Sequence, residues 1–454
     1  MTAPRHIAVI DVGKSNAKLA LVAASDLREL AVVTRPNRVL PGPPWPHFDL
    51  QGHWQFFLRN LGLLHARHRI DAIAVTTHGA ACVLLDRDGE LAAPMLDYEH
   101  PGPDALAAQY EARRPPFSQT GSPRLPGGLN AGAQLHWMLQ CCPGLRGRLA
   151  HVLSYPQYWG FRLTGALASD VCSLGCHTDL WNPWERRFSS LVADLGLTGK
   201  IAPGRGPAEV LGTLLPGVAA ATGLPVTTPV ACGIHDSNAS LYPYVLGLPA
   251  PFAVVSTGTW VVAMAVGGSP AALDPARDVL VNVSAAGEPV PSARFMGGRE
   301  YEIIAAGASA QPTAAERAAV LAKRLLLLPA VVPGSGPFAG RQMRWTAAPA
   351  STGERLVALG HYLALMTDTC LGLTGATGPV IVEGPFTRNA DFLAMLAALR
   401  PAGVSIATSA TGTSAGAALL CLASAAAPAT CAVAPPPEAA ALRALAARWR
   451  RATA

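Results

Sequence analysis

Two stretches of the chain have an apolar strand, a polar turn with a glycine, and a return strand, which is the pattern of a β-hairpin; in the first, the return strand alternates apolar and polar residues. The first covers residues 7–22 and turns at Gly13, and the second covers residues 252–266 and turns at Gly258. Gly258 follows Gly13 by 245 residues, just over half of the 454-residue chain. We therefore expect two similar halves, 1–245 and 246–454, that each begin with such a hairpin.

A second pattern places one carboxylate at a corner of the chain. Residues 229–232 are apolar and indicate a buried strand, Gly233 lets the backbone turn sharply, and residues 237–240 are typical of a helix start. Asp236 is thus predicted at a strand-to-helix junction. It could act chemically there, or it could simply cap the helix, as aspartate often does.

The other apolar periodicities predict the remaining elements. Strands are expected at 72–76, 81–85 and 379–382, with a hairpin closing at the turn 86–89, and residues 94–100 are expected as a short strand that runs into a loop with two carboxylates. Helices are expected at 54–68, 104–113, 130–140, 153–163, 314–327, 353–373, 390–399, 417–423 and 438–451. Residues 121–128 and 203–206 are expected as surface loops, 267–298 as a polar region rich in Pro and Gly, and 427–437 as a linker.

Composition narrows the class of protein. With 50% apolar and 14% charged residues the chain can bury sizeable cores. Its apolar runs are interrupted before the roughly 18 residues that a membrane helix needs, and its start lacks a signal-peptide pattern, so we expect a cytoplasmic protein without membrane contact. A net charge of +6 without a stripe of basic and aromatic residues argues against nucleic acid as a partner.

The nine cysteines are an odd number and include no Cys-x-x-Cys pair, which favours reduced thiols. Cys172, Cys176 and His177 could suggest a zinc site. No second pair of ligands follows at a suitable spacing, so a structural role is favoured.

The two glycine turns, the carboxylate corner and a late Gly/Thr/Asn strand-to-helix loop, in this order, resemble the FGGY family of sugar kinases in the actin/hexokinase-like ATPase superfamily. The resemblance covers roughly residues 7–425 and includes residues 153–165 and 170–184. It implies an α/β fold with two ribonuclease-H-like (actin-like ATPase) lobes and a central cleft between them. The lobe 1–245 would then bind the sugar, and the lobe 246–454, with its closing helix 438–451, the nucleotide.

The resemblance implies ATP and Mg²⁺ as cofactors, since residues 11–15 and 256–259 resemble the family's phosphate loops and residues 384–389 its adenosine loop. The nucleotide-binding residues would be Gly13, Lys14, Ser15, Asn16, Thr257, Gly258, Thr259, Gly384, Thr387 and Asn389. Asp11 would hold Mg²⁺ mainly through water, and a solvated turn aspartate is the alternative. Either glycine could also mark only a tight hairpin.

Two further observations leave the nucleotide site open in detail. The adenosine loop departs from the family pattern, because Glu383-Gly384-Pro385 stands where two or three glycines are usual. Residues 411–414, just before the predicted helix 417–423, could supply further donors or only an N-cap.

For the acceptor, the resemblance indicates His78, Gly79, Asp97 and Glu99, together with Asp236 as catalytic base. Carboxylates accept hydrogen bonds from vicinal hydroxyls, and a histidine in a glycine loop after a strand suits the same task. A lone histidine is often only structural, however. Glu99 aligns with the Asp of the family's Trp-x-Asp pattern and Asp97 replaces the Trp, so the identity of the sugar stays open.

We therefore expect ATP-dependent phosphorylation of a primary hydroxyl of a small sugar, for example the ketoses rhamnulose, fuculose, xylulose or ribulose. The alternatives are a kinase of polyols such as glycerol or erythritol, and a sensor that binds nucleotide and sugar without turnover. A Rossmann dehydrogenase is disfavoured, because no Gly-x-Gly-x-x-Gly follows the first strand. The oligomeric state is not fixed by the sequence, and a homodimer is an open option.

Overall fold

The computed structural model describes residues 4–308, 310–408, 412–422 and 427–454. The chain forms two compact units. Unit 1 holds Met1–Gly247, Val281–Pro289 and Thr411–Ala427, and unit 2 holds Leu248–Leu280, Val290–Ala410 and Pro428–Ala454. The first segment of unit 1 ends two residues after the predicted boundary at 245. The prediction of two uninterrupted halves did not foresee that two later segments, 281–289 and 411–427, also belong to unit 1.

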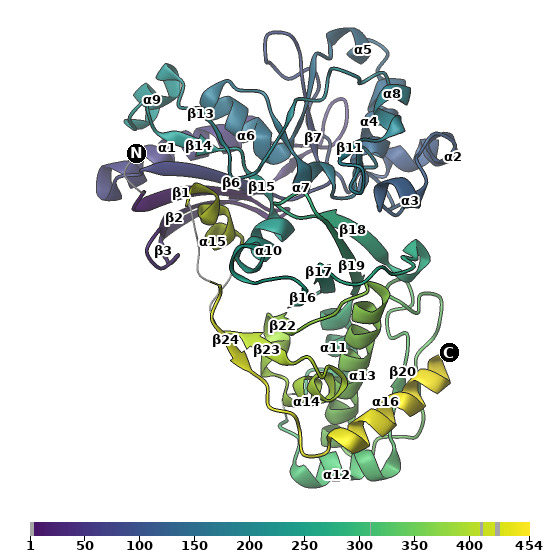
Figure 1. Cartoon of the computed structure of the whole chain (residues 1–454). Helices are drawn as coiled ribbons and strands as arrows, with labels where there is room; N and C mark the ends of the chain where they lie inside the picture. Colours follow the sequence, from purple (N-terminus) through teal and green to yellow (C-terminus); the bar gives the residue numbers. More distant parts are fainter. Residues whose placement is uncertain (1–3, 309, 409–411, 423–426) are drawn as a thin grey trace. The chain divides into compact units, whose positions relative to one another are not determined.

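Unit 1 is built on a mixed sheet with the strand order β13-β14-β6-β1-β2-β3 (Figure 1). Its strands are β1 (His6–Val12), β2 (Asn16–Ala23), β3 (Glu29–Pro36), β6 (Ala72–Thr77), β13 (Val210–Thr213), β14 (Pro229–Ala231) and the short β15 (Ile234–His235), which pairs with β6. The hairpin predicted over residues 7–22 is confirmed as the antiparallel pair of β1 and β2. β6 runs parallel to β1, and β14 runs parallel to β6.

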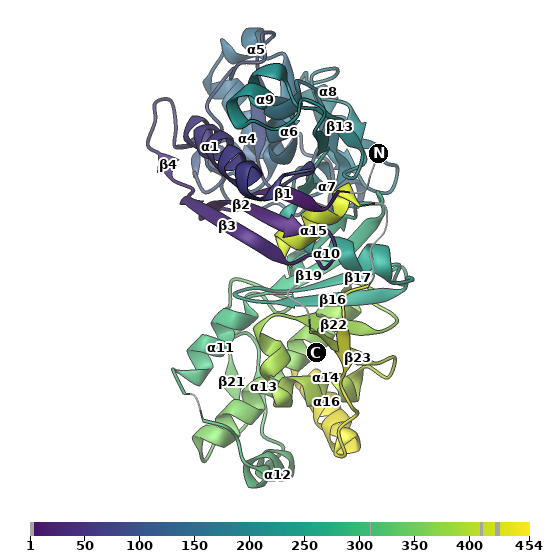
Figure 2. The same ribbon diagram turned by 90° about the vertical axis from the view of Figure 1, so that its left-hand side faces the viewer.

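Helices cover both faces of this sheet, as Figures 1 and 2 show. Helices of unit 1 include α1 (Leu50–His68), α2 (Ala107–Glu111), α3 (Phe117–Thr120), α4 (Ala131–Cys141), α5 (Leu145–Arg148), α6 (Tyr155–Thr164), α7 (Val171–Leu174), α8 (Ser190–Asp194), α9 (Pro216–Thr222), α10 (Asp236–Gly247) and α15 (Thr413–Ala418).

Successive side chains of β1 point to opposite faces of the sheet and pack into two different hydrophobic cores. Ala8 and Ile10 belong to the core that includes residues of α1 and α6. Ile7 and Val9 belong to the opposite core, which includes residues of α10 and α15. Because successive side chains of a strand point to opposite faces, Asp11 lies on the face that α15 covers.

Unit 2 repeats this arrangement. Its sheet has the order β18-β19-β17-β16-β22-β23-β24. The strands are β16 (Phe252–Thr257), β17 (Val261–Val266), β18 (Val279–Val283), β19 (Pro289–Phe295), β22 (Val380–Glu383), β23 (Val404–Ala407) and β24 (Thr430–Ala432), although residues 281–283 of β18 and Pro289 of β19 fall in the segment assigned to unit 1. From β19 to β24 the strand directions match those from β3 to β13, which confirms the prediction of two similar halves.

The core of unit 2 surrounds one long helix. Helices of this unit include α11 (Gly297–Ala305), α12 (Ala314–Lys323), α13 (Thr352–Leu373), α14 (Ala390–Leu399) and α16 (Ala439–Thr453). α13 is long and apolar enough to cross a membrane by composition alone, but 83% of its apolar window is buried inside the protein. It packs against α11, α12, α14 and β17, and its apolar composition is that of a core helix.

Several sequence predictions are corrected by the structure. Residues 267–298 are not simply a polar loop, since they contain β18 and β19, whose strand pattern is hidden between Pro and Gly residues. Residues 94–100 form no strand and keep one bridge, from Leu96 to His47. The helix predicted at 153–163 begins at Tyr155, because His151–Ser154 is the strand β8.

Two predicted surface loops are also corrected. Residues 204–205 pair with 169–170, and most of residues 121–128 are buried, because the Arg114 guanidinium donates a hydrogen bond to the Ser122 carbonyl oxygen and Asn130 receives one from the Leu125 backbone. Of the predicted segments near the end of unit 1, residues 409–411 and 423–426 lie outside the described residues.

Shorter elements complete the fold. Two-stranded ladders pair β4 (Val39–Leu40) with β5 (His47–Phe48), β7 (Cys82–Leu85) with β8, β9 (Ser169–Asp170) with β12 (Gly204–Arg205), β10 (Trp181–Asn182) with β11 (Arg187–Phe188), and β20 (Leu327–Leu328) with β21 (Arg344–Trp345). All nine cysteines are in the described residues and are free thiols.

Gly416 lets α15 approach α10 closely, and this contact generates a stability prediction. A Cβ at position 416 would lie 1.7 Å from the carbonyl oxygen of Ala239, which only backbone movement could relieve. We expect Gly416→Ala to lower the free energy of unfolding by about 1–3 kcal/mol, the usual range for an overpacked core.

Gly412→Ala is the matched control, because a Cβ at this N-cap of the same helix meets no described atom within 4 Å. Urea unfolding followed by tryptophan fluorescence compares the two variants with the wild type. Equal unfolding midpoints for both variants would contradict the close packing of α15 on α10.

Candidate active site

Asp236 begins α10 directly after β15. Its Oδ1 atom accepts a hydrogen bond from the Ser237 backbone N–H at 2.6 Å, and Nε2 of His235 lies 3.1 Å from the same oxygen. Within the described residues no hydrogen bond or ion pair reaches Oδ2, and 30% of the side chain is exposed. The protein therefore fixes one oxygen of Asp236 and leaves the other open to a ligand.

His235 is buried between this carboxylate and a thiol. Its Nε2 atom lies 3.6 Å from Sγ of Cys176, and Nδ2 of Asn238 lies 3.3 Å from its Nδ1. Burial lowers the pKa of His235, but Cys176 and Asp236 raise it to about 9. Burial raises the pKa of the Cys176 thiol, whereas His177 and His235 lower it to about 6. At neutral pH these values favour an imidazolium beside the Asp236 carboxylate.

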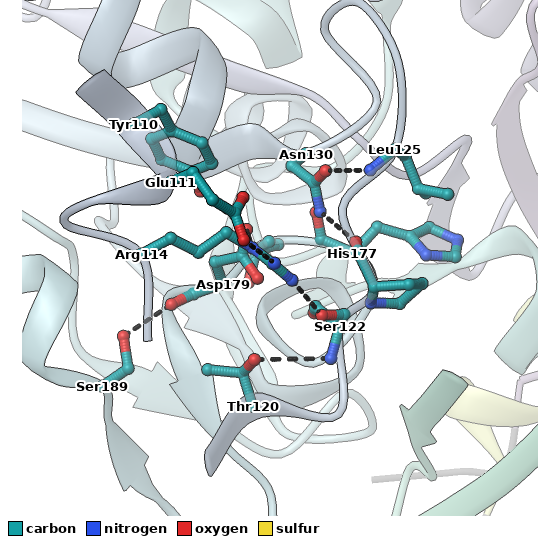
Figure 3. A network of polar contacts seen from close by, with 12 residues as sticks. Tyr110, Glu111, Arg114, Thr120, Ser122, Leu125, Asn130, His177, Asp179 and Ser189 are labelled. Carbon is teal, nitrogen blue, oxygen red and sulfur yellow. Dashed lines mark hydrogen bonds and ion pairs between the residues drawn. The ribbon is translucent and has the colours of Figure 1, made fainter. Parts of the chain in front are cut away.

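The loop that carries Cys176 is fixed by a buried polar network (Figure 3). The Asp179 carboxylate accepts a hydrogen bond from Nε of Arg114 at 3.1 Å, and Asn130 donates to the carbonyl oxygen of His177 at 3.3 Å. His177 and Asp179 have φ angles of 54° and 61°, which non-glycine residues adopt at a cost. The network therefore holds a strained loop, and with it the position of Cys176.

His78 follows β6 and lies among aromatic rings. Its centroid is 5.3 Å from that of Phe48 and 5.1 Å from those of Tyr98 and Tyr155. Nδ1 lies 2.9 Å from the carbonyl oxygen of Gly79, so it carries the proton and donates. Burial lowers the pKa of His78 and keeps the ring neutral. Nε2 is then a buried acceptor with no partner in the described structure.

Lys14 connects the first glycine turn to the two carboxylates predicted for the acceptor. Its Nζ atom pairs with Asp97 and lies 3.0 Å from Oε2 of Glu99. It also stands 4.6 Å from the centroid of the Tyr98 ring. Burial, followed by the charges of Glu99, Asp236 and Asp97, raises the pKa of Tyr98 to about 12. Asp97, Glu99 and Asp236 thus all lie close enough to Tyr98 to act on its pKa, and Lys14 contacts Asp97 and Glu99 rather than standing free.

Asp11 receives three donors on a single oxygen. The hydroxyl of Thr413 donates to Oδ2, the hydroxyl of Ser414 lies 3.5 Å away, and Nζ of Lys18 lies 3.1 Å away. Thr411, from the same predicted loop, lies outside the described residues. No contact from the described residues reaches Oδ1. The donors of residues 413–414 are thus used within unit 1, on the carboxylate predicted to hold Mg²⁺.

The two glycine turns have closely similar hydrogen bonds. Gly13 N–H donates to the Asn16 carbonyl oxygen, and Gly258 N–H donates to that of Trp260, both at 2.9 Å. Neither glycine has a positive φ, and a Cβ would meet nothing described nearer than 3.7 Å. The chain's own conformation therefore does not require glycine at either turn. The side chains of Ser15, Asn16 and Thr259 make no hydrogen bond to a described residue.

In unit 2, most of the predicted nucleotide residues hold one another in place. Thr257 donates its hydroxyl to the Glu383 carbonyl oxygen, Thr387 donates to that of Gly384 at 2.8 Å, and Asn389 caps α14. Gly384 has φ 82°, and a Cβ there would lie 2.0 Å from the Thr257 carbonyl oxygen. Only glycine fits this position.

Sequence reasoning missed the partners of the predicted residues. His235 adjoins Asp236 in the same corner, but nothing in the spacing indicates that Cys176 meets it. Lys18 stands directly opposite Asp11 in the first hairpin, and the ion pair between them was also not predicted. Among the described residues no group of three or more His, Cys, Asp or Glu side chains could hold a metal ion. Mg²⁺ needs fewer protein ligands than that, because it keeps much of its water and binds substrate phosphates.

Comparison with known proteins gives a family match for each part of the chain. The profile described as "FGGY family of carbohydrate kinases, N-terminal domain" matches residues 6–242. The profile described as "Carbohydrate kinase FGGY, C-terminal domain" matches residues 249–430.

Similar sequences and structures extend this finding. L-fuculokinase of Escherichia coli K12 is 27% identical over 271 residues, 57% of this chain and 56% of that protein. A rhamnulokinase of Klebsiella pneumoniae subsp. pneumoniae is 27% identical over 282 residues, 56% of this chain and 53% of that protein. The matches thus span about half the length of these curated relatives.

Solved structures align over nearly the whole chain. A carbohydrate kinase from Novosphingobium aromaticivorans is 36% identical, with 99% of each chain covered and a TM-score of 0.93. Xylulose kinase from Rhodospirillum rubrum is 20% identical, with 99% of this chain and 98% of that chain covered and a TM-score of 0.77, and it shares the fold.

Replacing Cys176 tests the pairing of thiol and imidazole. We expect Cys176→Ala to lower the pKa of His235 from about 9 by one unit or more, because the negative charge of the thiolate is lost. Histidine-selective ¹⁵N NMR across pH 5–10 measures the change. Cys370→Ala, which removes a buried thiol of unit 2, is the control. If the pKa of His235 is the same in Cys176→Ala as in the wild type, Cys176 is not a thiolate that stabilises the charged imidazole.

Proposed function

Because this chain belongs to the FGGY family of carbohydrate kinases, whose actin-like ATPase fold it shares, we propose that it transfers the γ-phosphoryl group of ATP to a primary hydroxyl of a small sugar. The observation that carries the proposal is the free oxygen of Asp236 beside a cluster of groups suited to hydroxyls. A ketose is the favoured acceptor, since the relatives include proteins named for fuculose, rhamnulose and xylulose.

The acceptor would bind among side chains that accept hydrogen bonds. His78 offers Nε2 as an acceptor, and its ring cannot move easily because aromatic rings pack around it. Glu99 has 64% of its side chain exposed and can reach a second hydroxyl, whereas Asp97 is buried and orients Lys14. Such convergent acceptors suit a polyhydroxy compound.

Asp236 is the proposed general base. Proton transfer requires the base oxygen to lie within hydrogen-bond reach of the reacting hydroxyl. With Oδ1 held by Ser237 and His235, Oδ2 is the oxygen that would accept the hydroxyl proton. The proton leaves the hydroxyl as its oxygen bonds to the γ-phosphorus, and ADP leaves with the electrons of the broken P–O bond. His235 orients the carboxylate.

The glycine turns are proposed to bind the phosphates of ATP. A methyl group would fit at Gly13 and at Gly258, so a phosphate oxygen can approach either backbone closely. The free side chains of Ser15, Asn16 and Thr259 add donors. Oδ1 of Asp11 would hold Mg²⁺ through water, and the ion would offset the negative charge of the phosphates. The loop of residues 383–389 is proposed to take the adenosine.

A screen for ADP release tests this function. The protein is incubated with ATP and Mg²⁺ and a panel of D- and L-ketoses, aldoses and polyols. We expect ADP release with at least one ketose. Release only with glycerol or erythritol would reassign the acceptor to the polyols. If ATP binds but no compound of the panel causes ADP release, the protein is not a kinase of these sugars, and a sensor that binds without turnover becomes the favoured function.

Asp236→Asn is expected to reduce kcat by about 10²–10⁴-fold, because the amide cannot accept the hydroxyl proton. ATP and the acceptor should still bind, which isothermal titration measures. Asp26→Asn, in an exposed turn of the same unit, is the matched control. Turnover near the wild-type rate in Asp236→Asn would remove Asp236 as the base.

His78→Phe is expected to raise the KM of the acceptor about 3–10-fold, the effect of one lost hydrogen bond, while the ring packing is kept. His136→Phe is the matched control, because His136 is another buried histidine of unit 1 with an unpartnered Nε2, and it packs against Tyr110 instead. Steady-state kinetics with the accepted sugar separate the two variants. A similar KM in both would place the acceptor away from His78.

A further inference from the structure

A chain of hydrogen-bonded polar groups leads from the partly exposed Arg35, in the sheet of unit 1, through two buried side chains to the first glycine turn. Nη1 of Arg35 lies 2.8 Å from Nδ1 of His53, and Nε2 of His53 lies 2.8 Å from Oδ1 of Asn37. Nδ2 of Asn37 then donates to the Gly13 carbonyl oxygen at 2.9 Å. His53 and Asn37 are 0% and 8% exposed.

The direction of every hydrogen bond in this chain is determined. A guanidinium can only donate, so Nδ1 of His53 must accept and the ring proton must be on Nε2. That proton is donated to Asn37, whose Oδ1 is therefore the atom facing His53. The amide nitrogen of Asn37 is left to face Gly13. Arg35 is itself held by an ion pair with Asp49, the N-cap of α1.

The histidine stays neutral, as this arrangement requires. Burial lowers the pKa of His53, and the charge of Arg35 lowers it further, to about 4. Asp49 opposes this shift and His78 adds slightly to it. These groups act on His53 from β3, from the start of α1 and from the loop after β6.

Asn37 holds the turn at two points. Its side chain binds the Gly13 carbonyl oxygen, and its backbone N–H donates to the Ser15 carbonyl oxygen at 2.9 Å. A trans peptide is planar, so the N–H of Lys14 points away from the Gly13 carbonyl oxygen. No described residue accepts from that N–H. By holding the Gly13 carbonyl oxygen, Asn37 therefore also fixes the direction of the Lys14 N–H, which stays free to donate to a ligand.

We propose that Arg35, His53 and Asn37 form a positioning relay that fixes the first phosphate loop so that the Lys14 N–H meets the polyphosphate of ATP. This role rests on the proposed function. Asn37 and His53 are positioning residues here, because they touch the loop and not the reacting atoms.

Asn37→Asp tests the relay with almost no change in shape. The carboxylate can still accept from His53, but it places a second acceptor against the Gly13 carbonyl oxygen. We expect the Kd for MgATP, measured by isothermal titration without sugar, to rise about tenfold or more. The KM of the acceptor should not change.

Asn60→Asp is the matched control. Asn60 also donates its amide to a carbonyl oxygen, that of Phe56 at 2.7 Å, but it does so within α1 and away from the turn. If Asn37→Asp does not fold, His53→Phe measured in the same way takes its place, because the ring still fits beside Phe57 and Trp159.

The tautomer of His53 gives a readout that does not depend on activity. Histidine-selective ¹⁵N NMR, assigned with His53→Phe, should show a neutral Nε2–H ring at pH 6–8. MgATP binding unchanged in Asn37→Asp, or an Nδ1–H or charged His53, would overturn the relay while leaving the kinase intact. A wild-type protein that binds no MgATP would overturn the proposed function as well.

Discussion

The carboxylate of Asp11 and the short helix α15 make the contact on which the geometry of unit 1 depends. A sheet with parallel strands needs cover on both faces, and the second face of β1 is covered by a segment 402 positions away in sequence. Gly416 allows that segment to lie directly against α10. The first glycine turn, the start of α10 and the Asp11 carboxylate are therefore placed by one packing arrangement.

Two carboxylates of unit 1, those of Asp11 and Asp236, each have one oxygen bound by neighbouring side chains and one oxygen that the described residues leave free. Lys18 and two hydroxyls occupy Oδ2 of Asp11, and His235 with Ser237 occupies Oδ1 of Asp236. Each carboxylate keeps one oxygen without a contact from the described residues. A buried charge without a partner is costly. The half-satisfied carboxylates of the buried Asp11 and the partly exposed Asp236 are therefore what a site for Mg²⁺-bound phosphates and a sugar hydroxyl would be expected to contain.

The sequence allowed the repeated hairpins, the corner at Asp236 and most helices to be predicted, because these depend on local periodicity and turn chemistry. α14 was predicted residue for residue. β18 and β19 were missed because Pro and Gly around them hide a pattern that only pairing in the sheet makes visible. The contacts of Cys176, Thr413 and Lys14 were missed for a different reason. Each joins segments that local spacing does not relate, and only the fold brings them together.

The most direct test of the account is ³¹P NMR of the reaction of the wild-type protein with MgATP and the best acceptor found. Phosphoryl transfer to a primary hydroxyl predicts a new phosphomonoester signal, split into a triplet by two methylene protons, that grows in step with ADP. Signals of ADP and inorganic phosphate without any new ester signal, or an ester split into a doublet by one proton, would contradict it.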